Sequence, residues 1–206
     1  MILQRLWDKV LRIGAYRKVA NQLEILVRKE TKEDYDQIRE VIKSAFKAIE
    51  GSNNEFNEWT LAERIRESEY YINDLSLVAV VDDTVVGHIM FTPMKIKGNV
   101  ECFESLDLAP VSVHIDYQNQ GIGKLLVRSG IEAAKKMGYK SLIVMGHPKY
   151  YQSFGFKLAS NWKIGLDAEC SSKYLFALEL VEGGLDGISG IVEYCPPFYN
   201  ENGELI

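Results

Sequence analysis

The spacing of hydrophobic residues changes along the chain, and each change predicts a different element. The apolar run from Leu23 to Arg28 predicts a first strand. Thr31 then opens a Thr-x-x-Asp capping box ahead of apolar residues at helical spacing, which predicts a helix over residues 32–49. A polar loop separates this helix from a second one, which is expected over residues 59–68.

The next segments are strand-like. Leu77–Val81 and Val85–Thr92 flank Asp82-Asp83 and predict a hairpin. A long strand is expected over Cys102–Ile115, with a break at Ala109-Pro110 because proline has no N–H to donate to a ladder. Further along, the pattern predicts a turn at Lys95–Asn99, a helix over Gly121–Met137, a strand over Ser141–Met145, a helical turn at Lys149–Ser153, and strands over Phe156–Ser160, Tyr174–Val181 and Gly190–Tyr194.

This mixed order of elements predicts an α+β fold with a mixed β-sheet flanked by helices, not a doubly wound fold. We expect three segments: a basic amphipathic helix over residues 1–22, a main domain over 23–182, and a C-terminal extension over 183–206 that packs on the domain. The N-terminal helix can pack on its own domain or on a second subunit, or it can lie on a membrane or a partner.

Composition narrows the class of protein. With 206 residues, 47% of them hydrophobic, the chain is long and apolar enough for an ordinary globular core. A net charge of −5 argues against coating of nucleic acid, and no apolar run approaches the roughly 20 residues of a membrane span. The three cysteines form no CxxC pair and the three histidines have no metal-ligand spacing. We therefore expect a cytoplasmic protein with reduced thiols, no bound metal and no membrane partner.

The junction between the long strand and the following helix has the features of an anion-binding site. Gly121-Ile-Gly123 opens the helix a few residues after Ile115, so unpaired N–H groups and the helix dipole meet there. Lys124 and Arg128 add positive charge, and together these features suit a phosphate or pyrophosphate. The dinucleotide motif would need glycine in place of Leu126, and the P-loop would need glycine in place of Gln118. The residues alone also allow a glycine-softened helix start without a ligand.

At this point the sequence resembles a known family. Gln118-Asn-Gln-Gly121-Ile-Gly123 is similar to the Q/R-x-x-G-x-G/A motif of the GNAT superfamily of acyl-CoA-dependent N-acyltransferases. Leu108–Val113 resembles the strand that precedes this motif in the family, and Tyr151-Gln-Ser-Phe-Gly155-Phe156 resembles its Y-x-x-x-G-F signature. The resemblance covers about residues 23–182 and is strongest to the bacterial YhbS-like branch, most of whose members have only predicted substrates.

The resemblance implies a sheet that splays between its fourth and fifth strands, with acetyl-CoA as co-substrate. Its pantetheine arm would add along the strand like an extra strand, and backbone amides would bind its pyrophosphate. Two positions depart from the family pattern: Met145–Pro148 lacks an asparagine, and Ile115 stands where proline is common. The residues that the resemblance assigns to the cofactor are Val111, Ser112 and Val113 for the pantetheine and Gln118, Asn119, Gln120, Gly121, Ile122, Gly123 and Lys124 for the pyrophosphate.

Acyl transfer to an amine needs a proton acceptor, an oxyanion donor and a proton donor for the leaving thiolate. The resemblance implies that a backbone N–H near Val113 stabilises the oxyanion and that Tyr151 donates a proton to the thiolate. Tyr151 could instead be a buried aromatic residue that hydrogen-bonds through its hydroxyl. Tyr150 is expected to have a packing role. For the proton acceptor we consider four residues, of which Glu104, on the upstream part of the long strand, comes first among the carboxylates: Glu55, Glu104, Asp107 and His114.

The sequence thus predicts an enzyme that moves an acetyl group from acetyl-CoA to an amine by direct attack in a ternary complex. The alternatives are a catalytically silent acyl-CoA-binding or sensing module on the same fold, and a protein whose docked N-terminal helix is the functional part. The acceptor is expected to be a small-molecule or peptide amine, with walls from the Glu55–Glu58 loop and the 184–206 tail. That tail could also complete a homodimer.

Overall fold

A computed structural model describes residues 24–47, 58–166 and 173–205. The expected N-terminal helix over 1–22 and the candidate base Glu55 lie outside the described residues. The chain forms two compact units. Unit 1 comprises the described residues up to Ala62 with Asn73–Met90 and Pro110–Gly130; unit 2 comprises Glu63–Ile72, Phe91–Ala109 and the described residues from Ile131 onward.

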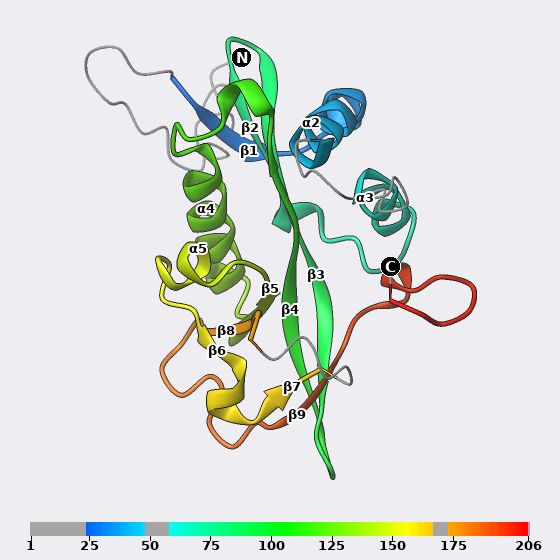
Figure 1. The fold of residues 1–206 in the computed structure, drawn as a ribbon, viewed down its shortest axis with the longest axis vertical. Coiled ribbons are helices and arrows are strands. Elements are labelled where there is room, and N and C mark those ends of the chain that lie inside the picture. Colours follow the sequence, from blue (N-terminus) through cyan, green and yellow to red (C-terminus); the bar gives the residue numbers. More distant parts are fainter. Residues whose placement is uncertain (1–23, 48–57, 167–172, 206) are drawn as a thin grey trace, which may run out of the picture. The chain divides into compact units, whose positions relative to one another are not determined.

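Unit 1 is built on antiparallel strands, visible in Figure 1. Strand β1 (Leu26–Lys29) pairs with β2 (Ser76–Val81), which pairs with the first half of β3 (Thr84–Lys97). Asp82 and Asp83 form the hairpin turn at φ values of 45° and 60°, the left-handed geometry that two-residue hairpin turns favour. The predicted hairpin is therefore confirmed.

The first helical segment of unit 1 begins as the capping box predicts. The Thr31 N–H donates to the Asp34 carboxylate at 2.7 Å, and Asp34 also forms a two-bond ion pair with Arg28 at 2.6 and 2.7 Å. This arrangement ties β1 to the 3-10 turn Lys32–Asp34, from which α2 (Tyr35–Lys47) continues. The second predicted helix is α3 (Glu58–Arg66), whose last turn belongs to unit 2.

Unit 2 contains a parallel pair of long strands. There β4 (Cys102–Val113) runs parallel to β5 (Ser141–Met145), and β5 pairs antiparallel with β8 (Leu175–Glu179). The short strand β6 (Lys157–Leu158) adds to β8. Overall the strands hydrogen-bond in the order β1-β2-β3-β4-β5-β8-β6, so the sheet is mixed and the predicted fold class is confirmed.

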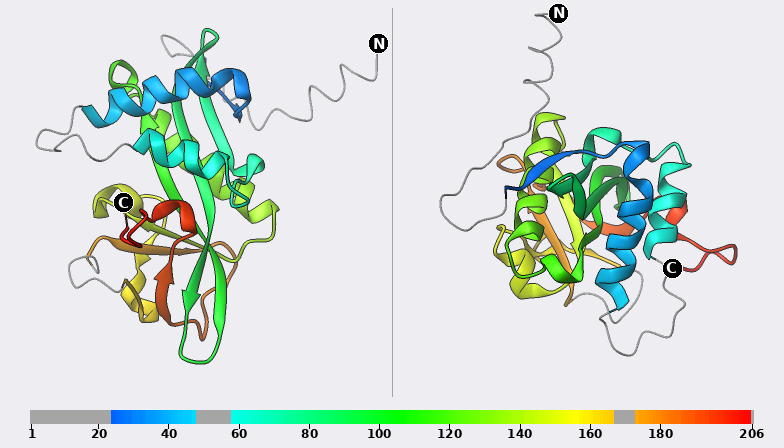
Figure 2. Two further views of the ribbon diagram at one scale, coloured as in Figure 1. Left: turned by 90° about the vertical axis from the view of Figure 1, so that its right-hand side faces the viewer. Right: turned by 90° about the horizontal axis from the view of Figure 1, so that it is seen from above.

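The C-terminal segment adds one more strand to unit 2. Strand β9 (Gly190–Glu193) pairs antiparallel with Lys95–Lys97 of β3, and Figure 2 shows the two side by side. On its other side β9 pairs in parallel with β7 (Ile164–Gly165), an element the sequence pattern did not predict because only two residues form it. The remaining helices are α4 (Ile122–Lys136) and α5 (Pro148–Gln152), both close to their predicted bounds.

Two strand predictions were wrong in detail. Strand β4 runs without a break through Pro110, and β3 runs through Pro93 to Lys97 instead of turning at Lys95. The registered β4–β5 pairs are Leu106 with Leu142 and Asp107 with Ile143. Pro110 lies beyond these pairs, so its missing N–H removes no hydrogen bond between β4 and β5. The predicted strand over 156–160 shrinks to β6, because Ala159–Trp162 forms a 3-10 turn.

Packing in unit 1 requires glycine at one position. A Cβ on Gly87 of β3 would lie 2.9 Å from Leu126 and 3.1 Å from Ile122, so α4 approaches the strand backbone directly. All six residues of β2 are buried, which means that both faces of this strand are covered. Among the described residues, no helix is long and apolar enough to cross a membrane.

Unit 1 also buries a polar cluster. The Glu30 carboxylate lies 3.0 Å from His88 Nε2, and the Ser76 hydroxyl lies 3.4 Å from the same nitrogen. The side chains of Glu30 and His88 are fully buried. His88 therefore has the structural role expected for a buried histidine, and it contributes to stability through its carboxylate partner.

Replacing Glu30 with alanine is expected to lower the free energy of unfolding by about 3 kcal/mol, because the substitution removes the carboxylate that faces a buried imidazole. The matched control is Glu40→Ala, which removes an exposed partner of Lys43 at 3.8 Å and should cost less than about 0.5 kcal/mol. Urea unfolding measures both. A loss below about 1 kcal/mol for Glu30→Ala would contradict a stabilising role for this pair.

Candidate active site

The end of β4 is held in place by a short turn within unit 1. The His114 N–H donates to the Val86 carbonyl at 2.9 Å, and the Ile115 N–H donates to the Ser44 hydroxyl of α2 at 2.9 Å. The His114 ring caps the following 3-10 turn by accepting from the Asp116 N–H at 3.4 Å. His114, considered as a base from the sequence, is thus occupied in shaping the turn.

The next residues form an anion-binding geometry at the start of α4. Asn119 and Gly121 have φ values of 60° and 87°, which turn the chain sharply before the helix. The first helical bond runs from the Leu125 N–H to the Gly121 carbonyl at 3.0 Å, and the described hydrogen bonds include none donated by the amides of residues 119–124. These amides are available to an anion, as the sequence predicts.

Charge and a side-chain brace complete this turn. Lys124 and Arg128 are exposed, and neither is ion-paired within the described chain. The Gln118 side-chain amide donates to the Val113 carbonyl at 3.1 Å, which holds the turn against the strand end. The Gln118 N–H donates to the Ile115 carbonyl at 3.4 Å, so the available amides begin at Asn119 and not at Gln118.

The strand segment assigned to pantetheine is only partly exposed. Val111 and Val113 are half-buried, whereas Ser112 is buried and its hydroxyl has no hydrogen-bond partner in the described structure. No residue of this segment is in register with β5, whose pairing with β4 ends at Asp107. One edge of β4 therefore lacks a β5 partner over residues 111–113, as the predicted splay requires.

Tyr151 lies in unit 2, on α5, where it is 7% exposed. Its ring meets Tyr150 and Phe156 edge-on, with centroid distances of 5.1 and 5.7 Å. Only glycine fits at position 146, because a Cβ there would overlap the Tyr151 ring. Burial, followed by the neighbouring Tyr150 and the charge of Asp107, raises the pKa of Tyr151 well above its ordinary value.

The two carboxylates on the unit 2 part of β4 have different surroundings. Glu104 is exposed, whereas Asp107 is 2% exposed. The charge of Asp107 contributes to raised pKa values of Tyr151, Tyr194 and Cys195, which places this carboxylate close to all three. In the sequence, Glu104 is the first candidate among the carboxylates. The burial of Asp107 has one signal in the sequence, its place within the most apolar stretch of the strand.

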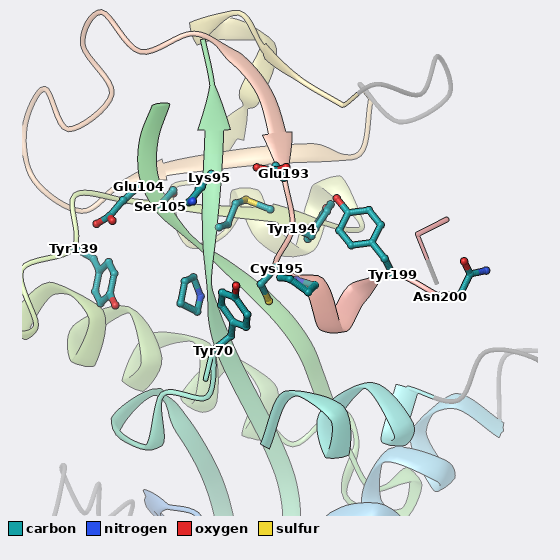
Figure 3. A pocket seen from close by; sticks show the side chains of 13 residues that line it. Tyr70, Lys95, Glu104, Ser105, Tyr139, Glu193, Tyr194, Cys195, Tyr199 and Asn200 are labelled. Carbon is teal, nitrogen blue, oxygen red and sulfur yellow. The ribbon is translucent and has the colours of Figure 1, made fainter. Parts of the chain in front are cut away.

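A cavity of about 700 Å³ opens beside these strands, and all its lining residues belong to unit 2. Figure 3 shows side chains from β3, β4 and the C-terminal segment around it. The residues of the 184–206 tail that line it are Glu193, Tyr194, Cys195, Pro196, Tyr199 and Asn200. Glu104 lines the cavity, whereas Asp107 is not among the lining residues. Within the described ranges, no cluster of three or more potential metal ligands occurs.

The comparisons with known proteins match this chain to one family. The model of the acetyltransferase (GNAT) domain matches residues 26–159. The uncharacterized N-acetyltransferase YhbS of Escherichia coli K12 is 30% identical over 125 residues, which cover 60% of this chain and 74% of YhbS. The uncharacterized N-acetyltransferase YjhQ of the same organism is 37% identical over 126 residues, covering 61% of this chain and 66% of YjhQ.

Two solved structures are similar over most of the chain. The GNAT family N-acetyltransferase YhbS from Escherichia coli, in complex with CoA, has a TM-score of 0.76 and 27% identity, covering 88% of this chain and 96% of that one. A GNAT family acetyltransferase from Brucella melitensis, in complex with acetyl-CoA, has a TM-score of 0.66 and 31% identity, covering 84% of this chain and 97% of that one.

The contact between Gly146 and Tyr151 gives a direct test of the site's packing. Gly146→Ala is expected to displace the Tyr151 ring and to cost about 1–3 kcal/mol of stability, because the added carbon would overlap a buried ring. Gly165→Ala is the control, since its Cβ would meet nothing closer than 3.8 Å. Thermal unfolding and near-ultraviolet circular dichroism measure both variants, and equal effects would contradict the packing.

Proposed function

Because the chain belongs to the GNAT acetyltransferase family, we propose that it transfers an acetyl group from acetyl-CoA to the amino group of an acceptor. The carrying observation is the turn over residues 118–124, where the amides from Asn119 onward have no intramolecular acceptor and meet the positive end of α4. The CoA and acetyl-CoA complexes of the two similar structures support the same cofactor here.

In this reaction the amine nitrogen attacks the thioester carbonyl carbon. A C–N bond forms and the C–S bond breaks, so an ammonium and acetyl-CoA become an amide, CoA-SH and one released proton. The amine must first lose a proton to a base, and the departing sulfur must gain one. We propose that acetyl-CoA lays its pantetheine along Val111–Val113, whose β5 side has no registered partner, and its pyrophosphate on the amides of residues 119–124.

Tyr151 is proposed to assist the leaving thiolate. Its raised pKa keeps the phenol protonated throughout the physiological range. A full proton transfer to a thiolate with a pKa near 8.5 is then less favourable than for an ordinary tyrosine, so the phenol acts chiefly by donating a hydrogen bond to the developing charge. The proton acceptor is proposed to be Glu104, which reaches solvent and the cavity; Asp107 is the buried alternative on the same strand.

Binding of acetyl-CoA tests the cofactor site. Gly121→Glu should weaken binding about 100-fold, because it sets a carboxylate among the amides that receive the pyrophosphate. Gly138→Glu is a matched control: Gly138 ends α4 with a φ of 86°, close to the 87° of Gly121, and neither position has an atom within 4 Å of an added Cβ. Calorimetric titration measures both, and an equal loss in the two variants would refute this placement.

Tyr151→Phe tests the chemistry separately from binding. Turnover of acetyl-CoA with reactive amines is expected to fall about 100-fold, as on removal of a donor to developing charge, while acetyl-CoA affinity is retained. The neighbouring Tyr150→Phe serves as control, since Tyr150 packs against Tyr151 and Phe154. Acetyl-CoA binding without turnover by the wild-type protein would instead support an acyl-CoA-binding module.

A further inference from the structure

The cavity of unit 2 is lined by residues that are not part of the proposed cofactor site. About 700 Å³ is the size of a site for a small organic molecule. Four tyrosines line it, from three stretches of chain: Tyr70 after α3, Tyr139 after α4, and Tyr194 and Tyr199 in the C-terminal segment. Tyrosine rings offer flat apolar faces that attract both aromatic groups and cations.

Three of these tyrosines make contacts through the ring or through the backbone. Tyr194 stacks on Phe198 with centroids 5.0 Å apart, and the Arg64 guanidinium donates to the Tyr199 carbonyl at 2.5 Å. The Tyr139 N–H closes the end of α4 by donating to the Ala134 carbonyl at 3.2 Å. The fold therefore fixes the Tyr194 ring and the backbone at Tyr139 and Tyr199, which lowers the entropic cost of binding a flat ligand.

The cavity is lined by charged residues of both signs, among which Glu104 is the carboxylate without an ion pair in the described ranges. Glu104 and Glu193 line it against one cation, Lys95, and Glu193 is already ion-paired with Lys97 at 2.5 Å. Glu104 forms no ion pair within the described ranges, and Figure 3 shows it beside Tyr139. Its charge contributes to the raised pKa of Tyr139, after burial. The charge of Asp107 acts in the same way on Tyr194 and Cys195 at another wall.

The same buried carboxylate links the cavity to the proposed chemistry. Ser105 lines the cavity, and Asp107, two residues further along β4, projects from the same face of the strand. Asp107 also acts on Tyr151, the proposed donor to the thiolate. The cavity-lining residues Tyr194 and Cys195 and the proposed donor Tyr151 thus share one neighbouring carboxylate, that of Asp107.

We propose that this cavity takes the acceptor, and that the acceptor is a primary amine, protonated in solution, on an aromatic or similarly flat apolar body. The inference rests on the proposed acetyl transfer. Glu104 receives the ammonium, and the tyrosines receive the body. On deprotonation the nitrogen attacks the acetyl carbonyl carbon, the C–N bond forms, the C–S bond breaks, and one proton remains on CoA-SH while one is released.

Three probes separate the two parts of this recognition. 2-Phenylethylamine has the cation and the ring, 2-phenylethanol has the ring alone, and ethylamine has the cation alone. Calorimetric titration of each into the full-length protein, without acetyl-CoA, is expected to show that 2-phenylethylamine binds at least about tenfold more tightly than either of the others. Acetylation of the two amines is then followed with acetyl-CoA present.

Two variants test which residue is responsible for each binding preference of 2-phenylethylamine. Glu104→Gln should remove the preference for 2-phenylethylamine over 2-phenylethanol, whereas Tyr139→Ala should remove the preference over ethylamine. The controls are Glu101→Gln, on the exposed turn before β4, and Tyr174→Ala, at a tyrosine that is 51% exposed and outside the cavity. Both controls should leave all three affinities within about twofold of the wild-type values.

The outcomes distinguish this inference from the proposed function. If acetyl-CoA binds but 2-phenylethylamine binds no more tightly than the two other probes, the acceptor class is wrong and the transferase proposal stands. If 2-phenylethylamine binds but is not acetylated while ethylamine is, the cavity is not the acceptor site. If acetyl-CoA itself does not bind, the proposed function fails. Selective binding with acetylation of 2-phenylethylamine, lost as described in the two variants, supports the inference.

Discussion

The short parallel pairing of β4 with β5 is the constraint on which the candidate site depends. Only Leu106 and Asp107 are in register with β5, and a buried hydrogen bond of 2.8 Å between the Ser105 and Ser141 hydroxyls fixes the start of this contact. Beyond it, β4 continues to Val113 without a β5 partner. One strand therefore presents a buried carboxylate where it is paired, and a backbone edge that can receive an extended ligand where it is not.

The anion-binding turn owes its availability to backbone geometry more than to side chains. Positive φ angles at Asn119 and Gly121 direct the chain into α4 so that the amides of its first turn have no acceptor in the described structure. Two polar contacts, from Ser44 and Gln118, keep the preceding residues in place. Such a site is organised before a ligand arrives, which reduces the entropy lost on binding.

The proposed cofactor site and the proposed acceptor site draw on different parts of the chain. The family model ends at residue 159, whereas the aromatic cavity takes Tyr194 and Tyr199 from beyond that point. Strand β9 brings these tyrosines into the cavity by pairing with β3, next to the β4 residues that line the same cavity. Selection among acceptors can thus change through the C-terminal segment while the cofactor turn stays the same.

Local signals in the sequence determined much of the fold and the position of the turn before α4. The capping box at Thr31, the turn at Asp82-Asp83 and the start of α4 at Gly121 were predicted because each depends on residues within a few positions of one another. The β9–β3 pairing and the burial of Asp107 beside Tyr194 were decided by tertiary structure alone. These features join residues far apart in sequence, and hydrophobic periodicity specifies which face of an element is buried but not which distant side chain it meets.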